Sequence, residues 1–436
     1  MSEAATPSSE WLRGQRWFGA KGSDLSIAGV ADTTVGGGLV ISVLDLGDSR
    51  YQLVRLHEDS QPDTLTEPVT GAALSRALAE QQTAEGPSGA IRFERPTDAG
   101  PWPDGSVRPL GAEQSNTSVV VGDEVVVKVF RRIEPGENPE LEMLRFLGRQ
   151  GYPHVPGIEG WATLTADDGT VSTLAIAQSM VHDGRDGWEL VLERLGDADR
   201  GASVIPLLRD LGATLAGLHR SLGADKDDPE FAPEPGGRTV AERIAAHIEA
   251  QAADVLPRVA LRLGEAAPIE SPERVAAAAR AMADRLDAGA VLRHHGDLHL
   301  GQTLHTPGGW VILDFEGEPA RPLEHRRAKQ PALRDVAGLL RSLSYAAATR
   351  ARAGHPWSTG WETAARAALL DGYLGSADPE LLPGAGTPTT RLLALLELEK
   401  VLYELHYELG NRPDWVELPL QGLRRIVDPP RAGALQ

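Results

Sequence analysis

The chain has 436 residues, enough for two or three domains, and its 41% hydrophobic content is that of an ordinary globular protein. The formal net charge of −19 at pH 7 argues against a general nucleic-acid or anionic-membrane binder, because either needs a basic face. The lack of cysteine excludes disulfides, thiolate catalysis and every cysteine-ligated metal site. The sequence shows no signal-peptide core and no run of about 18 apolar residues. We therefore expect a soluble, cytoplasmic protein of enzyme size.

The first segment, residues 1–88, is predicted to form a small β-rich subdomain. It opens with a Trp- and Arg-rich piece, residues 11–22, which is best explained by packing with snorkelling charges. Two strand-like runs follow over residues 39–46 and 51–56, joined by a Gly-Asp-Ser turn, and a helix is expected near residues 71–81. A stretch rich in Pro and Gly then marks a boundary.

The second segment, residues 89–182, is predicted to form a small α+β lobe. Residues 118–130 hold two β-branched runs around a Gly-Asp pair, which is the pattern of a hairpin with a short turn. An Asn-Pro pair at residues 138–139 predicts the start of a helix. A further strand is expected over residues 171–177.

The third segment, residues 183–436, is predicted to be mostly helical. A Ser-Pro-Glu signal at residues 271–273 predicts a helix that ends at Gly289. Another helical pattern runs over residues 390–409.

The most informative part of the chain is a His-Gly-Asp loop followed by a short strand. The loop contains Asp297 and Gln302, and the C-terminal end of the strand delivers Asp314 and Glu316. Asp297, Gln302 and Asp314 are expected to converge, and oxygen ligands without thiolates suit Mg²⁺. A carboxylate beside that cation can accept the proton of an attacking hydroxyl. The pattern therefore predicts a phosphoryl-transfer site.

Two histidines in the same loop admit a different metal. His295 and His299 give zinc ligation as the alternative. They fit better as packing and hydrogen-bonding groups of the loop, so zinc is the weaker interpretation.

These motifs resemble the catalytic and metal-binding loops of the aminoglycoside-phosphotransferase-like kinases. The closer similarity is to the bacterial maltokinases, and it extends from Trp11 to the C-terminus. The resemblance implies an α+β chain with a bilobal protein-kinase-like fold: a small β-rich N-lobe, a helical C-lobe and an additional N-terminal cap subdomain. The motifs that carry it are residues 113–118, 138–142, 295–302, 314–319, 333–338 and 411–415.

The resemblance assigns a nucleotide site by position. Lys128 is similar to the strand lysine that contacts the α- and β-phosphates, and Glu142 is similar to its helix partner; a solvated strand-end lysine is the alternative. A segment without Gly-x-Gly-x-x-Gly takes the place of the phosphate loop, where backbone N–H groups and hydroxyls would cradle phosphate. Residues 178–181 are similar to the hinge that meets adenine. The expected ATP-binding residues are Ser115, Asn116, Thr117, Ser118, Lys128, Glu142, Gln178 and Met180.

The same resemblance makes Asp297 the catalytic base and makes Gln302 and Asp314 the Mg²⁺ ligands, with Gln302 where most of these kinases have Asn. Asp335, in an Arg-Asp pair, is expected to anchor a helix behind the catalytic loop. On the predicted C-terminal helix, Tyr and Glu recur four residues apart, which suits either a sugar-binding face or an amphipathic surface helix. The expected sugar-binding residues are Asp297, His299, Glu316, Tyr403, Glu404, Tyr407, Arg412 and Trp415.

These expectations give a first hypothesis, an ATP-dependent kinase that converts maltose to maltose 1-phosphate and feeds α-glucan and glycogen synthesis, with Mg²⁺ as cofactor. The alternative is the same chemistry on glucosamine, glucose or an aminoglycoside. A third hypothesis is a catalytically inactive pseudokinase that acts as a binding module, which the intact catalytic and metal-binding residues oppose. The expected partners are sugar and ATP, without nucleic acid or membrane. We expect a monomer or homodimer, with a trehalose synthase as candidate associate.

Overall fold

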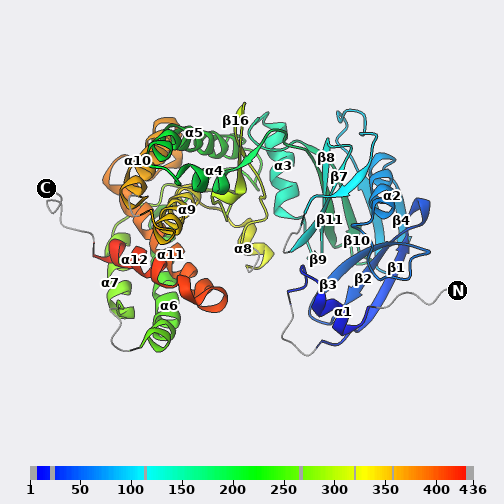
Figure 1. Ribbon diagram of the computed structural model, residues 1–436, viewed down its shortest axis with the longest axis horizontal. Coiled ribbons are helices and arrows are strands. Elements are labelled where there is room, and N and C mark those ends of the chain that lie inside the picture. The colour runs from blue at the N-terminus through cyan, green and yellow to red at the C-terminus, as the bar shows by residue number, and fades with distance from the viewer. Residues whose placement is uncertain are drawn as a thin grey trace. The chain divides into compact units, whose positions relative to one another are not determined.

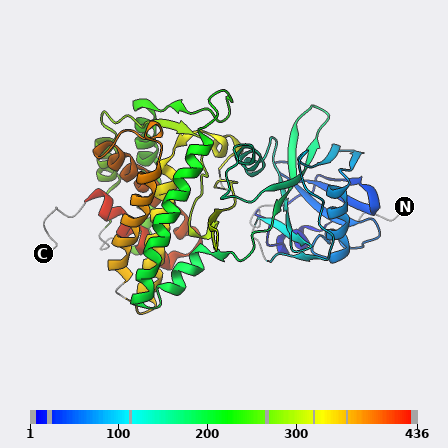
Figure 2. The same ribbon diagram turned by 90° about the horizontal axis from the view of Figure 1, so that it is seen from above.

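The computed structural model describes residues 7–19, 25–111, 115–264, 269–318, 321–355 and 358–428. The chain divides into two compact units, residues 1–182 and 183–436. The first unit carries most of the β-structure and the second most of the helices (Figures 1 and 2), so the predicted α+β class is confirmed. Within the described residues, no helix is both long enough and apolar enough to cross a membrane.

The first unit contains two antiparallel sheets that share one apolar core. The first sheet has the order β1-β2-β3-β9, and the second has the order β4-β5-β10-β11-β8-β7-β6. Helix α2 packs against strands of both sheets (Figure 1). Buried side chains of both sheets belong to one cluster. The elements are α1 (Ser9–Gly14), β1 (Gly29–Thr34), β2 (Leu39–Asp45), β3 (Arg50–Leu56), α2 (Pro68–Ala79), β4 (Thr83–Gly86), β5 (Gly89–Glu94), β6 (Val107–Pro109), β7 (Asn116–Val121), β8 (Val125–Phe130), β9 (Arg132–Ile133), α3 (Pro139–Arg149), β10 (Ile158–Thr165) and β11 (Val171–Ser179).

Local predictions for this unit are confirmed where turn or capping signals were strong. The two predicted strand pairs are β2 with β3 and β7 with β8, and the predicted single strand is β11. Helix α3 begins as the Asn-Pro pair predicts, because the Asn138 side chain accepts a hydrogen bond from the Glu140 N–H at 2.8 Å.

The Trp- and Arg-rich opening is a packing element, as predicted. Trp17 and Phe18 are buried and lie in a small apolar cluster with Tyr51. The guanidinium of Arg131 lies over the Trp17 ring, 5.0 Å from its centroid. Residues 20–22 of the predicted segment lie outside the described residues.

The proposed boundary between cap and N-lobe falls in the turn that joins β4 to β5, two paired strands of one sheet. Strand β9, which comes later in the chain, pairs with β3 and completes the first sheet. The two predicted subdomains therefore share a sheet and a core, and their separation stays a prediction.

The second unit is built from long helices with short strands between them. Helices α5 and α10 run side by side, and α11 packs against α6, α9 and α12 (Figures 1 and 2). Two three-stranded sheets have the orders β12-β15-β16 and β13-β14-β17. The elements are β12 (Arg185–Asp186), α4 (Gly187–Arg194), α5 (Ala198–Leu222), β13 (Glu234–Pro235), α6 (Gly237–Leu263), α7 (Pro272–Ala283), β14 (Ala290–Leu292), β15 (Thr303–Thr306), β16 (Gly309–Ile312), α8 (Leu323–Arg327), β17 (Gln330–Pro331), α9 (Leu333–Arg352), α10 (Ser358–Ser376), α11 (Thr387–Asn411) and α12 (Glu417–Val427).

The helix predicted from the Ser-Pro-Glu signal ends earlier than expected. Its start is confirmed, because the Ser271 side chain accepts a hydrogen bond from the Arg274 N–H at 3.2 Å. It ends at Ala283 and not at Gly289, since the chain must extend into β14, which pairs with β13 and β17. Helix α11 is a few residues longer at each end than predicted.

Candidate active site

The His-Gly-Asp loop is held from behind by a buried carboxylate. Asp335, in the first turn of α9, is 1% exposed and accepts hydrogen bonds from the backbone N–H groups of His295 (2.9 Å) and Gly296 (3.0 Å). Its Oδ2 also lies 3.0 Å from Nε2 of His219. Gly296 has a φ of +88°, where a side chain would be strained, so glycine allows the turn that brings both N–H groups to the carboxylate.

The surroundings keep this carboxylate ionised in a dry interior. Burial alone would raise the pKa of Asp335, but the hydrogen bond from His219 and the neighbouring histidines lower it well below its ordinary value. Burial lowers the pKa of His294 to about 3, so that imidazole is neutral at physiological pH. On its other side, the His219 ring lies 2.9 Å from the Tyr373 hydroxyl. The loop is therefore anchored on a fixed negative charge.

His295 connects the loop to the strand that follows it. Its Nε2 lies 2.8 Å from the Leu313 carbonyl oxygen, and its Nδ1 accepts a 3.3 Å hydrogen bond from the Asp297 N–H. The ring also packs on Phe315, with centroids 4.9 Å apart. Since both ring nitrogens are used, His295 has none left for zinc, and the hydrogen-bonding interpretation is the one that the structure supports.

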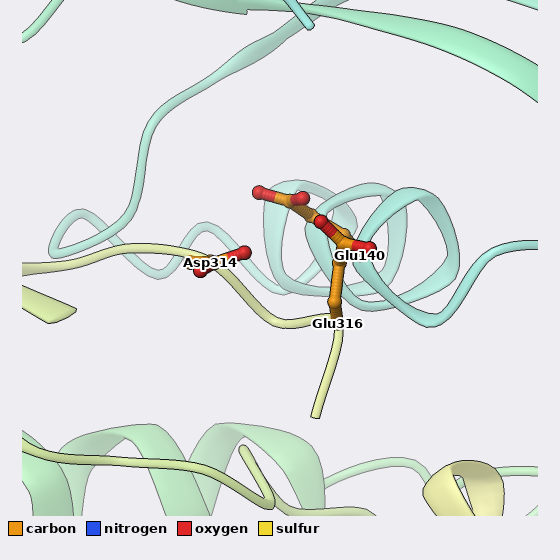
Figure 3. Close-up of side chains that lie close together, drawn as sticks. All are labelled: Glu140, Asp314 and Glu316. Atoms are coloured by element: carbon orange, nitrogen blue, oxygen red, sulfur yellow. The ribbon is translucent and has the colours of Figure 1, made fainter. Parts of the chain in front are cut away.

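Gln302 and Asp314 meet where the loop and the strand converge. Asp314 follows β16, and the Nε2 of Gln302 donates a 2.7 Å hydrogen bond to its Oδ2. Asp314 has a φ of +62°, an uncommon conformation for a residue other than glycine and one that clusters at functional sites. Figure 3 shows Asp314 and Glu316 leaving the same loop.

This pair fits a magnesium ion by its donor chemistry. One carboxylate and one amide, both partly exposed, offer oxygen ligands and no sulfur or imidazole. A half-turn of the Gln302 amide presents its oxygen beside the carboxylate.

Asp297 is held by a lysine that the sequence pattern did not single out. The Nζ of Lys400, on α11, lies 3.1 Å from Oδ1 of Asp297 and 2.8 Å from Oε1 of Glu318. Glu318 also forms an ion pair with Arg321. The ammonium group lies 4.7 Å from the centroid of the Tyr403 ring. These five residues form one cluster around the predicted base.

The charges in this cluster are fixed at neutral pH. Burial alone would lower the pKa of Lys400, but the carboxylates of Asp297 and Glu318 raise it above its ordinary value. Burial alone would raise the pKa of Glu318, but Lys400 and Arg321 lower it to about 2. Burial raises the pKa of Tyr403 to about 12, and the charge of Glu318 adds to this effect. The cluster therefore combines a cationic lysine, ionised Glu318 and a neutral phenol.

Two other residues predicted to bind sugar, His299 and Glu404, differ in whether a ligand can use them. His299 is in the loop, where burial lowers its pKa and keeps the imidazole neutral. Glu404 is not available to a ligand, because both carboxylate oxygens bind the buried guanidinium of Arg341 at 2.7–3.1 Å. We therefore interpret Glu404 as a structural partner and leave it out of the proposed sugar site.

Farther along α11, the predicted aromatic residues contact arginines. Arg412 pairs with Glu408 at 2.7 Å and lies over the rings of Tyr407 and Trp415. Trp415 is parallel to Tyr345, with ring centroids 6.5 Å apart. Tyr407 is 42% exposed. In the described residues, no side-chain hydrogen bond, ion pair or ring contact joins this group to the cluster around Asp297, so its sugar-binding role stays a prediction.

In the first unit, the lysine of β8 pairs with a glutamate that the sequence did not single out. Lys128 Nζ lies 2.8 Å from Oε2 of Glu140, in the first turn of α3. The predicted pairing of Lys128 with Glu142 stays a prediction. Gln178 donates a 2.8 Å hydrogen bond to Oε1 of Glu140. Glu140 thus joins two of the predicted nucleotide-binding side chains.

Strand register divides the predicted phosphate segment between the two faces of the sheet. Ser118 is the cross-strand partner of Lys128, so Ser118 and Asn116 share its face. Thr117 has the opposite face, where its hydroxyl accepts a 2.8 Å hydrogen bond from Nε of Arg131. The Thr117 hydroxyl therefore lies on the face away from Lys128, and the phosphate-binding role of residues 115–118 stays a prediction.

The ends of the predicted nucleotide site are described only in part. Ser115 is exposed just before β7, and residues 113–114 of the predicted motif lie outside the described residues. The Met180 N–H, in the predicted hinge, donates a 2.7 Å hydrogen bond to the Glu124 carbonyl. A backbone contact of Met180 with adenine would therefore use its carbonyl oxygen.

Known proteins are similar to this chain in both sequence and fold. A glucosamine kinase of Mycolicibacterium smegmatis is 30% identical over 337 residues, which cover 74% of this chain and 79% of that protein. A glucosamine kinase of Streptacidiphilus jiangxiensis is 28% identical over 409 residues, 88% of each protein. A solved glucosamine kinase in complex with glucosamine, ADP and inorganic phosphate covers 92% of this chain and 95% of its own, at 24% identity and a TM-score of 0.68.

The structural similarity confirms the predicted kinase-like fold, with a β-rich part and a helical part. The sequence profile of the phosphotransferase enzyme family matches residues 106–380, which include the catalytic-loop motif and the strand lysine. The profile match and the M. smegmatis relative, which is 30% identical over 74% of this chain, together show that the chain belongs to the phosphotransferase enzyme family.

Proposed function

We propose that this chain is an ATP-dependent kinase that phosphorylates a hydroxyl of a small sugar, with glucosamine as the first candidate acceptor. The observation that carries the proposal is the joining of Asp297, Gln302 and Asp314 by one hydrogen-bonded loop and strand, which supplies a base and two oxygen ligands. The relatives named glucosamine kinase support the choice of acceptor, and they favour it over the maltose that the sequence alone predicted.

The residues divide the chemistry among them. Oδ2 of Asp297 accepts the proton of the acceptor hydroxyl as its oxygen bonds to the γ-phosphorus and the bond to the β-phosphate oxygen breaks, which releases ADP. Gln302 and Asp314 would hold Mg²⁺, which offsets the negative charge of the phosphates. Lys128 binds nucleotide phosphate oxygens, and Ser118 offers a hydroxyl on the same face.

A neutral sugar such as maltose is the second candidate, and one observation favours it. Glu318 is already neutralised by Lys400 and Arg321, and Asp297 by Lys400, so no carboxylate of this cluster is left for the ammonium group of an amino sugar. Association with a trehalose synthase, which would accompany the maltose reaction, stays a prediction.

A coupled ADP-release screen over glucosamine, maltose, glucose, trehalose and aminoglycosides tests the proposal. We expect turnover with glucosamine or with a neutral sugar, and NMR of the product identifies the phosphorylated hydroxyl. ADP release that no acceptor raises above the background of ATP alone would contradict kinase activity and would leave the inactive binding module as the explanation.

The cation ligands give a separate prediction. Asp314→Ala should abolish Mg-dependent turnover, because both charge neutralisation and alignment of the phosphates depend on this carboxylate. Gln302→Ala should be milder, because a neutral amide contributes less to a cation than a carboxylate does. The measurement is kcat against Mg²⁺ concentration for both variants. An active Asp314→Ala enzyme beside an inactive Gln302→Ala enzyme would reverse the two roles.

A further inference from the structure

The ammonium group of Lys400 is held at three points. It lies within hydrogen-bond distance of Oδ1 of Asp297 and of Oε1 of Glu318, and it lies against the Tyr403 ring. An ammonium group has three N–H donors, so two are directed to carboxylates. About a quarter of each of the Lys400 and Asp297 side chains is exposed, so this ion pair is only partly screened by water.

The rest of the cluster prevents Lys400 from moving freely. Glu318 is fixed on its other oxygen by Arg321. The residue before Lys400, Glu399, is buried and forms a 2.6 Å ion pair with Arg334 of α9. Helix α11 is therefore tied to the helix that anchors the catalytic loop, and the ammonium is delivered to a defined point.

We propose that Lys400 is a positioning residue for phosphoryl transfer, which binds Oδ1 of Asp297 so that Oδ2 is the oxygen that takes the acceptor's proton. This inference rests on the proposed function. In the described residues, Oδ1 has Lys400 as its side-chain partner and Oδ2 has no protein donor, so the two oxygens of the base are distinguished by the lysine.

Charge gives a second reason for a cation at this point. Asp297 and Glu318 are both carboxylates and share the same ammonium group, and an incoming phosphoryl group brings further negative charge. Without Lys400 the two carboxylates would repel each other and the base would turn toward solvent. A displacement of about 1 Å is enough to cost on the order of 10²-fold in rate.

The test compares three variants of Lys400 with a matched lysine elsewhere. Lys329 is equally well bonded, with Nζ 2.7 Å from the Pro229 carbonyl, 2.8 Å from the Ala232 carbonyl and paired with Glu234. Its contacts do not include the catalytic loop. Lys329→Met therefore measures how much kcat changes when a hydrogen-bonded lysine of this unit is removed, and we expect this variant to retain kcat.

Lys400→Met should lower kcat for the best acceptor of the screen on the order of 10²-fold, with little change in the KM for ATP. Lys400→Arg should recover part of the rate, because it keeps a cation near Asp297. Added ethylammonium should raise kcat of Lys400→Ala, since the cavity left by the side chain can take a small cation. A residue that only holds helices together would not respond to a free cation.

Two results would overturn the inference: a Lys400→Met enzyme with the kcat of Lys329→Met, or a Lys400→Ala enzyme whose kcat does not respond to ethylammonium. Asp297→Asn separates this failure from that of the proposed function. If Asp297→Asn is inactive while Lys400→Met is normal, only the role of Lys400 is lost. If Asp297→Asn turns over normally, the proposed catalytic base is wrong.

Discussion

An Asp297→Asn enzyme should lose about 10²–10⁴-fold in kcat, because an amide keeps the shape of the side chain and cannot accept the proton of the attacking hydroxyl. Nucleotide affinity should be unchanged, since the predicted nucleotide contacts come from other residues. Steady-state ADP release measures kcat, and titration calorimetry with ADP measures the affinity. A fall in kcat without a change in nucleotide affinity is the signature of a lost base.

Glu318→Gln is the matched control for this prediction. It also removes a carboxylate from Lys400, at 2.8 Å, but it leaves the proposed base in place. We expect a smaller loss of kcat than in Asp297→Asn. Near-normal turnover of Asp297→Asn would contradict the assignment of Asp297 as the base. An equal loss of kcat in both variants would show that Asp297 acts only through the ion-pair cluster.

The core of the candidate site could be predicted because it is local in sequence. Gln302 and Asp314 are separated by one hairpin, β15 with β16, so the pairing of two adjacent strands is sufficient to bring them together. His295 then binds the carbonyl just before Asp314. The convergence of Gln302 and Asp314 therefore follows from the local sequence and needs no contact with distant parts of the chain.

The cluster around the base could not be predicted, because its members are far apart in the chain. Lys400 reaches Asp297 across 103 residues and Glu318 across 82. On a helix with alternating charges, a lysine next to glutamates is ordinarily a solvated residue with local ion pairs. Only the packing of α11 against α9 shows that this one faces the catalytic loop.

In the predicted nucleotide site, the sequence does not tell which side chains of a helix or strand share a face. The sequence places two glutamates at the start of α3, and it did not single out Glu140, which the structure pairs with Lys128. Four consecutive polar residues looked like one phosphate loop, but β7 begins at Asn116 and a strand sends alternate side chains to opposite faces. Thr117 consequently contacts Arg131 and not the Lys128 face.

The order of strands in the sheets also could not be predicted from the sequence. The turn residues of a hairpin such as β7 with β8 predict its strand pairing. The pairs β5 with β10 and β3 with β9, in contrast, join segments that are far apart in the chain. Turn residues fix only neighbouring strands. The shared core of cap and N-lobe therefore emerges only in three dimensions.

Asp335→Asn should destabilise the protein by roughly 3–5 kcal/mol, because it removes the charge of a buried carboxylate that three donors share. The backbone N–H groups of the catalytic loop donate to the Asp335 carboxylate. An amide can place its own N–H₂ group against these donors, which then have no acceptor. Loss of the anchor should also lower kcat on the order of 10²-fold by displacing the loop. Urea unfolding at pH 7 measures the first effect and ADP release the second. Asp371→Asn is the control, since this exposed residue forms a 3.4 Å surface pair with Arg209 that should contribute about 1 kcal/mol or less.

The pH dependence of this loss has a defined sign. The folded-state pKa of Asp335 lies below the value of about 3.9 for an unperturbed aspartate, so ionised Asp335 stabilises the fold. Its contribution is complete above the unfolded-state pKa and is lost as the pH falls toward the folded-state pKa. The stability difference between wild type and Asp335→Asn should therefore be constant from about pH 7 to pH 5 and should narrow below about pH 4. A difference that stays constant into the acid range, or widens there, would mean that hydrogen-bond geometry, and not the charge of Asp335, holds the catalytic loop.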